Sequence, residues 1–298
     1  MTWLHNLWRF SRPHTIIGTT LSLLTLFVLA GALTGRGLAD GVRFGWALLA
    51  CLGANVFIVG LNQLTDVAID RINKPYLPLA SGAFSMLTGR AIIFTGLAVS
   101  LVVALWQGPF LLLTVGLSLV LGIAYSLPPV RLKRFPFWAA FCIIAVRGFI
   151  VNLLLYLHFQ YSWTGDTAIP PVVWLLTATI FCYSIIIAWF KDMPDVEGDD
   201  AHAIQTYSIN WGVARVFRYG NYLLAGLYLL LILLPFIVDL RVQPWIFAGL
   251  HLLLLGGLFL AGRRVSLVRQ ASIKRYYLTV WGFFFAEYIG FALAGTLA

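Results

Sequence analysis

Nine long apolar stretches dominate the sequence and restrict what this chain can fold into. A helix that spans a bilayer needs about 20 mostly apolar residues. The stretches cover residues 16–34, 44–63, 90–106, 109–127, 136–158, 170–190, 220–238, 244–262 and 277–297. The sequence lacks the alternation of apolar and polar residues that is typical of barrel strands, and lipid accommodates only helices and closed barrels. We therefore expect an all-α membrane protein, a bundle of nine transmembrane helices.

Charged residues are scarce, which supports a single polytopic membrane domain over residues 1–298. They make up 10% of the chain, whereas soluble domains average about 25%. The first 15 residues have no apolar core followed by a small-residue cleavage site, so we expect no removable signal peptide.

The basic residues indicate how the chain is oriented in the membrane. The net charge is +9, and nine alternating spans place most of the 20 Lys and Arg residues on one side. Basic loops face the cytoplasm. We therefore expect a cytoplasmic N-terminus, and we read the positive charge as membrane topology, with no nucleic-acid partner.

Acidic residues gather in two clusters, and each follows directly on an apolar stretch. Both contain the pattern D-V-x-x-D, once from Asp66 to Asp70 and once from Asp195 to Asp199. If the helices continue past the membrane, residues three or four apart share one face. That spacing joins Asn62, Asp66 and Asp70 in the first cluster and Asp192, Asp195 and Asp199 in the second. We expect Pro194 to bend the second helix end.

Two interpretations of these clusters are open. Acids are common at solvated helix ends, where they carry no function. However, acids at a helix C-terminus oppose its dipole, and stacked like charges repel. Neighbouring Arg71, Lys74 and Lys191 supply part of the compensating charge. All-oxygen clusters suit Mg²⁺, which protein sites usually complete with substrate phosphates, so we favour a site for a metal and a phosphate.

At these residues the chain resembles the UbiA superfamily of intramembrane prenyltransferases. Asn62, Asp66 and Asp70 match its N-D-x-x-D-x-x-x-D motif, in which Gln63 replaces the usual second acid, and the second cluster matches its later acidic motif. The segments `NQLTDVAIDRINKPYLPLASG`, `KDMPDVEGDD`, `WRFSRPHTIIGTT` and `AYSLPPVRLKR` are similar to homogentisate prenyltransferases of cyanobacteria and plastids. The resemblance covers essentially the whole chain and implies the nine-helix UbiA-like fold.

The resemblance also implies a reaction and a location. Mg²⁺ would be held by Asp66, Asp70, Asp192, Asp195 and Asp199, which are the expected catalytic residues. A phytyl or related prenyl diphosphate would react with homogentisate, with decarboxylation, at the cytoplasmic face of a cyanobacterial thylakoid or plasma membrane. The alternatives are another UbiA acceptor (4-hydroxybenzoate, dihydroxynaphthoate or the chlorophyll synthase substrate) and a membrane transporter. Transporters usually place ionisable groups near the bilayer midplane, which disfavours the last.

Polar and aromatic residues near the motifs are the candidates for substrate binding. They are Asn62, Arg12, Arg71, Lys74, Tyr125, Arg131, Lys133 and Lys191. Arg131, Lys133 and Arg134 are equally well explained as anchors next to anionic lipid. Tyr125 and Tyr183 are candidates to shield an allylic cation through cation–π interactions, although aromatic residues are also ordinary at membrane interfaces.

Arg147 and Glu287 are charges inside predicted spans, where ionisable residues are costly and usually functional or paired. Two hypotheses follow. In the first, the two side chains pair with each other, and for Glu287 we favour this structural role. In the second, Arg147 binds the diphosphate or the homogentisate carboxylate, and for Arg147 we favour this substrate role.

Overall fold

The computed structural model describes residues 2–201 and 205–297, and within them nine helical segments are long and apolar enough to cross a membrane. They are α2 (Pro13–Leu33), α3 (Gly41–Thr65), α5 (Met86–Gln107), α6 (Pro109–Ser126), the continuous run of α7 (Pro136–Ile144), η2 (Ala145–Ile150) and α8 (Val151–Thr164), α9 (Pro171–Phe190), α12 (Val213–Leu233) with η3 (Leu234–Phe236), α13 (Pro244–Arg263) and α14 (Gln270–Thr296). The nine predicted spans are confirmed, although several helices extend beyond the apolar stretches.

Local sequence signals explain where several helices begin. Pro occupies the first position of α2, α6, α7, α9 and α13, where its missing N–H costs no hydrogen bond and its fixed φ favours a helix. The Asp40 carboxylate caps α3 by accepting from the Arg43 backbone N–H at 3.2 Å. Ser85 caps α5 in the same way, accepting from the Thr88 N–H at 3.0 Å.

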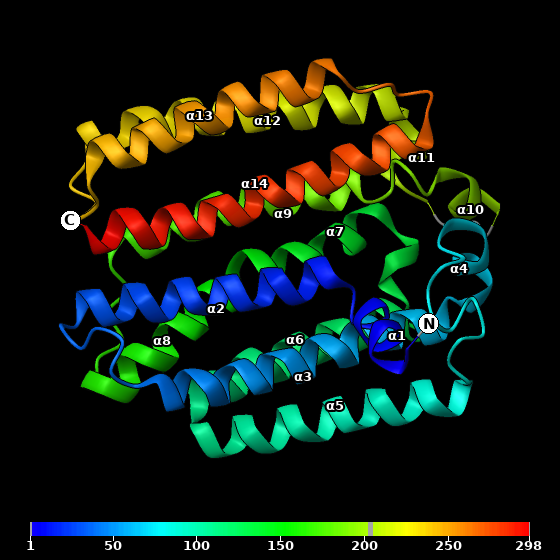
Figure 1. Ribbon diagram of the computed structural model, residues 1–298, viewed down its shortest axis with the longest axis horizontal. Helices are drawn as coiled ribbons and strands as arrows, with labels where there is room; N and C mark the ends of the chain where they lie inside the picture. The colour runs from blue at the N-terminus through cyan, green and yellow to red at the C-terminus, as the bar shows by residue number, and fades with distance from the viewer. Residues whose placement is uncertain (1, 202–204, 298) are drawn as a thin grey trace.

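Short helices collect at one end of the bundle. They are α1 (Trp3–Phe10), α4 (Val67–Asn73), η1 (Leu132–Arg134), α10 (Val196–Ala201) and α11 (Tyr207–Trp211). Figure 1 shows α1, α4, α10 and α11 at the end opposite the C-terminus. We call this end, with both acidic clusters, the polar end.

The long helices form a closed arrangement in which the first and last spans are neighbours. α2 packs between α3 and α14, and α9 contacts α7, α8, α12 and α14 (Figure 1). α3 packs closely on α5 because Gly53 and Gly96 face each other. A Cβ at either glycine would lie 2.8 Å from the other's carbonyl oxygen, and small residues are what allow such contacts between membrane helices.

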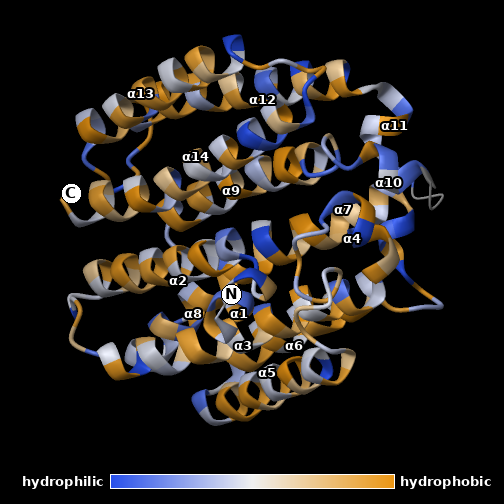
Figure 2. Ribbon diagram, turned by 45° about the vertical axis from the view of Figure 1, so that its right-hand side comes forward, coloured by the Kyte–Doolittle hydropathy of each residue, from blue (hydrophilic) through white to orange (hydrophobic). Residues whose placement is uncertain are grey.

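Apolar side chains cover both the interior and the outer surface. One cluster of buried hydrophobic residues extends from Phe10 to Ala294. Large apolar side chains such as Leu87, Leu253 and Ile237 are more than three-quarters exposed on the outside. Figure 2 shows hydrophobic residues along the long helices and hydrophilic ones concentrated at their ends. This distribution is that of a protein solvated by lipid.

The expectation of continuous helices through the acidic motifs is wrong. α3 ends at Thr65, and Asp66 adopts a non-helical conformation before α4 starts at Val67. α9 ends at Phe190, and a turn carries the chain to α10 at Val196. Pro194 lies in that turn, where it terminates the helix instead of bending it. The breaks turn the acids inward, over the end of the bundle.

Candidate functional site

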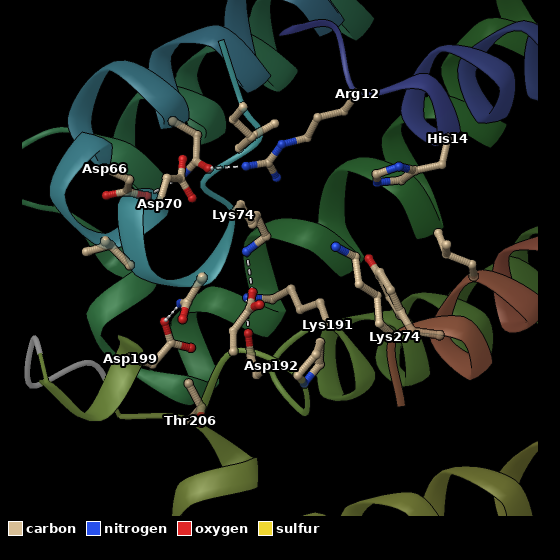
Figure 3. Close-up of a pocket in the computed structure, with 18 of the residues that line it drawn as sticks. Arg12, His14, Asp66, Asp70, Lys74, Lys191, Asp192, Asp199, Thr206 and Lys274 are labelled. Carbon is tan, nitrogen blue, oxygen red and sulfur yellow. Dashed lines mark hydrogen bonds and ion pairs between the residues drawn. The ribbon is translucent and has the colours of Figure 1, made fainter. Parts of the chain in front are cut away.

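A cavity of about 850 Å³ opens at the polar end, and we call it the outer cavity. Five aspartates from both motifs line it: Asp66, Asp70, Asp192, Asp195 and Asp199. Basic residues alternate with them in the lining: Arg9, Arg12, Lys74, Lys133, Lys191 and Lys274. Figure 3 shows Asp66 and Asp70 on one side, Asp192 and Asp199 on the other, and Lys74 between them. The structure thus brings the two motifs to one site, although 129 positions separate them in sequence.

The first motif is held by bonds to two other parts of the chain. Asn62 donates to Asp66 at 3.0 Å and accepts from the Arg12 guanidinium at 3.1 Å. Arg131 donates to the other Asp66 oxygen at 3.1 Å, and the Lys133 ammonium also pairs with Asp66. Asp66 therefore already has two cationic partners.

Arg12 adopts a backbone conformation that non-glycine residues rarely use. Its φ is +52°, immediately before Pro13. Strain of this kind is found mainly at functional sites, where the surrounding structure maintains it. Here it accompanies a guanidinium directed at the first motif (Figure 3).

Gln63, which replaces an acid of the family motif, has a structural role. Its side-chain amide is buried and donates to the Phe10 carbonyl at 2.6 Å. An ionised carboxylate has no proton to donate, so the amide attaches α1 to α3 where an acid would not.

The second motif is tied to the first by residues of α4 and its C-terminus. Lys74 pairs with Asp195, and Asn73 donates to Asp199 at 3.3 Å. The side-chain oxygen of Asn73, Oδ1, accepts from the Gly198 N–H at 3.1 Å. A Cβ on Gly198 would lie 2.2 Å from that oxygen, so this contact requires glycine.

Burial and crowding of acids perturb two carboxyl groups. Burial raises the pKa of Asp70 to about 6, against the opposing effect of Arg12 and Lys74. Burial, with Asp192 nearby, raises the pKa of Asp199 to about 7. One Asp70 oxygen is buried without a hydrogen-bond partner, so this carboxyl group lacks the stabilisation that the other acids receive.

The residues of the outer cavity fit a hard divalent cation by chemistry. Five carboxylates line one space, and a partnerless Asp70 oxygen is available as a ligand. Within residues 2–201 and 205–297, no three His, Cys, Asp or Glu side chains are already close enough together to hold a metal ion. In this structure lysine ammonium groups pair with three of the aspartates. Lys74 pairs with Asp195, Lys133 with Asp66, and Lys191 with Asp192 at 2.8 Å.

A second cavity of about 270 Å³, the inner cavity, extends into the bundle below the outer one. Seven residues line both spaces: Arg12, His14, Asn62, Tyr125, Lys191, Tyr277 and Trp281. Arg147 lines the inner cavity only, along with hydroxyl and amide side chains such as Ser22 and Asn55. Lys191 donates to the Tyr125 hydroxyl at 3.3 Å where the two cavities meet.

Most of the predicted site residues lie around these cavities. The exceptions among the described residues are Arg71, which is exposed on α4 and lines neither cavity, and Arg131, which reaches the site only through Asp66. Sequence reasoning missed several lining residues, among them His14, Asn73, Gln270, Lys274, Tyr277 and Trp281. His14 and Asn73 adjoin recognised motifs, which was a usable signal. The residues of α14 belong to no motif.

The hypothesis that Glu287 pairs with Arg147 is wrong. Glu287 is fully buried and bonds to His251 of α13 at 3.0 Å. Tyr183, a candidate for shielding a cation, is fully buried with its hydroxyl bonded to that of Tyr228, and it is absent from the described lining of both cavities.

Comparison with known proteins identifies the family. Residues 22–287 match the UbiA prenyltransferase family. The chain is 44% identical to the homogentisate phytyltransferase of Synechocystis sp., over 96% of this chain and 94% of that protein. It is 38% identical to the chloroplast homogentisate phytyltransferase 1 of Arabidopsis thaliana, over 95% of this chain and 73% of that one.

Solved structures show the same fold at low sequence identity. A UbiA homologue of Archaeoglobus fulgidus, bound to GPP and Mg²⁺, superposes with a TM-score of 0.64 at 18% identity, over 98% of this chain and 100% of that one. The apo UbiA homologue of Aeropyrum pernix gives a TM-score of 0.66 at 16% identity, over 93% and 96%. The fold, the family match and the relatives agree, and the chain belongs to the UbiA prenyltransferase family.

Proposed function

We propose that this protein transfers a prenyl group, with phytyl the expected one, from an allylic diphosphate to homogentisate in a Mg²⁺-dependent reaction. The observation that carries the proposal is the meeting of both acidic motifs in one cavity, which shares lining residues with a smaller cavity in the bundle. The homogentisate phytyltransferases at 44% and 38% identity support the choice of acceptor.

The carboxylates assigned to the metal are those of Asp66, Asp70, Asp192, Asp195 and Asp199. Bound there, Mg²⁺ supplies Lewis-acid neutralisation of the diphosphate leaving group. The A. fulgidus relative bound to GPP and Mg²⁺ supports this assignment. Because lysines pair with three of these aspartates in the structure, metal binding requires their ammonium groups to move.

The lysine ammonium groups that a metal displaces can bind the diphosphate instead. Lys74, Lys133 and Lys191 line the same cavity as the acids, so a short movement carries each ammonium group from a carboxylate to a diphosphate oxygen. Arg12, held by Asn62, adds a charge at the mouth of the inner cavity. Fixed positive groups aimed at the developing charge stabilise the transition state.

The proposed chemistry balances without any further reagent. The allylic C–O bond breaks, and its electron pair leaves on the diphosphate. A ring carbon of homogentisate then forms the new C–C bond and loses its proton. One proton replaces CO₂ on the acetate side chain, so the proton released by the ring accounts for the one consumed. The product is a methyl-prenyl-benzoquinol.

Isotope-labelled homogentisate tests the proposal in membranes that contain the protein. We expect ring label to enter a lipid-soluble product, and carboxyl label to be released as CO₂ in equal amount, when phytyl diphosphate and Mg²⁺ are present. Parallel reactions with geranylgeranyl and solanesyl diphosphates define the donor, and EDTA is expected to abolish both signals. Incorporation of 4-hydroxybenzoate with none of homogentisate would reject the acceptor.

We also propose that the polar end faces the cytoplasm of a cyanobacterial cell or its thylakoid. The excess of basic residues in the loops on that side supports this orientation. A cysteine introduced at exposed Leu4 is expected to react with impermeant maleimide only after the membrane is permeabilised, and one at exposed Leu297 without it. The reverse pattern would invert the topology.

A further inference from the structure

The lining of the inner cavity is basic, and of its described cations only Lys191 pairs with a carboxylate, that of Asp192 in the outer cavity. The described lining of the inner cavity includes Arg12, Arg147 and Lys191 and contains neither Asp nor Glu. The outer cavity, by contrast, has five aspartates. A buried charge without a counter-ion is unstable, so the inner cavity is complete only when an anionic group enters it.

Arg147 is the deepest of these charges and the least satisfied. In the described part of the chain it forms no ion pair, and its buried Nη1 has no hydrogen-bond partner. The guanidinium stacks on Trp281, with Cζ 4.3 Å from the ring centroid, and lies 5.4 Å from that of Phe284. Stacking fixes the plane of the group and offers it no negative charge.

A distortion of the helix presents this side chain to the cavity. Residues Ala145–Ile150 form a π-helical turn within the fifth span, a feature that often occurs at functional sites. Asn152 donates to the carbonyls of Arg147 and Gly148 at 3.0 and 2.9 Å, and Tyr288 donates to the Asn152 oxygen at 2.8 Å. Buried side chains of α8 and α14 therefore stabilise the turn that holds Arg147.

The dimensions and lining of the inner cavity suit a small aromatic acid. Its volume of about 270 Å³ is just below the roughly 300–1,000 Å³ of most small-molecule pockets, which suits a small ligand. Thr19, Ser22 and Asn55 provide hydrogen-bonding groups for phenolic hydroxyls. A long prenyl chain would leave the Arg147 guanidinium without a partner.

We propose that Arg147 binds the carboxylate of the aromatic acceptor and thereby selects homogentisate over acceptors that lack its acetate group. This inference rests on the proposed function. The carboxylate lies deep in the inner cavity, next to the guanidinium stacked on Trp281. The ring then extends toward His14, Asn62 and Tyr125, which line both cavities, so the carbon to be prenylated faces the diphosphate site.

Direct binding measurements on the purified full-length protein test this assignment without turnover. The ligands are homogentisate, methylhydroquinone (the same ring with a methyl group in place of the acetate) and a non-hydrolysable prenyl thiodiphosphate with Mg²⁺. We expect Arg147→Met to raise the Kd for homogentisate by roughly 30-fold or more, as for a buried carboxylate that loses its partner. The Kd for methylhydroquinone and for the thiodiphosphate should not change.

Two further variants control for non-specific effects and for misfolding. Arg36→Met removes an exposed arginine at the opposite end of the bundle and should leave all three affinities unchanged. If Arg147→Met no longer binds the thiodiphosphate because it misfolds, Arg147→Lys decides. It keeps the charge without the planar fork and should weaken homogentisate binding several-fold while leaving methylhydroquinone binding intact.

Other outcomes overturn the assignment. They are an unchanged homogentisate Kd in the Arg147 variants, equal weakening of both hydroquinones, or weakening of the thiodiphosphate alone, which would place Arg147 on the diphosphate. Wild-type protein that binds the thiodiphosphate and no homogentisate would instead reject the proposed acceptor, so the two failures are distinguishable.

Discussion

Two groups of buried ionisable side chains lie in this bundle, and they are built differently. In the outer cavity, five aspartates and several lysines share a space of about 850 Å³, and one Asp70 oxygen has no partner. Between α13 and α14, Glu287 and His251 are each fully buried and bond to each other at 3.0 Å. The first group faces a cavity, whereas the second is packed among aromatic rings.

The pair of Glu287 and His251 has no net charge. His251 Nδ1 lies 2.6 Å from the Phe247 carbonyl, which accepts only, so Nδ1 carries a proton. The single remaining acidic proton is then either on the other ring nitrogen or on Glu287, and both arrangements have no net charge. Burial alone therefore does not mark a functional group. One Glu287 oxygen also lacks a hydrogen-bond partner, so what distinguishes the outer group is that it borders a cavity.

The sharpest test of this difference removes one charge from the outer cavity. Asp66→Asn or Asp195→Asn keeps the side-chain shape but loses a ligand to the proposed metal. We expect prenyl transfer to fall by about 1,000-fold or more, because metal neutralisation of the leaving group is worth several kcal/mol. Each variant also loses an ion pair, Asp66 with Lys133 or Asp195 with Lys74, so the unfolding temperature in detergent should fall and the rate is compared per folded protein.

Asp239→Asn is the matched control, since Asp239 is exposed and caps a turn by accepting from the Arg241 N–H at 3.1 Å. It should keep full activity. Near-normal turnover in both motif variants would remove the aspartates from catalysis.

For the pair between α13 and α14 we expect a loss of stability with unchanged activity. Glu287→Gln leaves a buried histidine with a weaker partner, and we expect a stability loss of about 1–3 kcal/mol, measured as a lower unfolding temperature. The protein that remains folded should transfer prenyl groups at the normal rate. Lost activity at unchanged stability would show instead that this pair takes part in the reaction.

The smallest expected effect concerns pH in the absence of Mg²⁺. The pKa values of Asp70 and Asp199 are raised to about 6 and about 7 from the ordinary value of 3.8. The folded state therefore holds more protons than the unfolded state between about pH 4 and pH 7, and its stability falls as the pH rises through that window. We expect the unfolding temperature to fall as the pH rises across that window.

Addition of Mg²⁺ at pH 8 should restore that stability, because the metal binds the ionised carboxylates of the folded state alone. Asp199→Asn serves as the comparison and should show a shallower dependence on pH. A wild-type unfolding temperature that rises across the window would contradict the assigned protonation.

The sequence was informative about the fold because the relevant signal is long and local. Each span is a run of about 20 apolar residues, and the nine runs correspond to the nine spans in the described structure. The ends of the helices were less predictable. At the break, Asp66 contacts Arg131 and Lys133, which are distant in sequence and could not be read from the local pattern.

The candidate site was predictable in part, for a similar reason. Repeated acid motifs are visible in the chain, whereas Tyr277 and Trp281 enter the cavities only because α14 packs beside α2 (Figure 1). His251 as the partner of Glu287 depends on the same kind of packing, between α13 and α14. Single aromatic or histidine residues in apolar helices carry no local pattern that would distinguish them.

The contact between Lys74 and Asp195 has a consequence for the working cycle. It joins the first half of the polypeptide to the second at the point where the leaving group is expected. Without substrate, the Lys74 ammonium neutralises the Asp195 carboxylate in the outer cavity. A metal ion that arrives alone must therefore compete with Lys74 for Asp195. On the proposed function, the ion and its anionic substrate together would displace Lys74 from Asp195, and loss of pyrophosphate would let this pair form again.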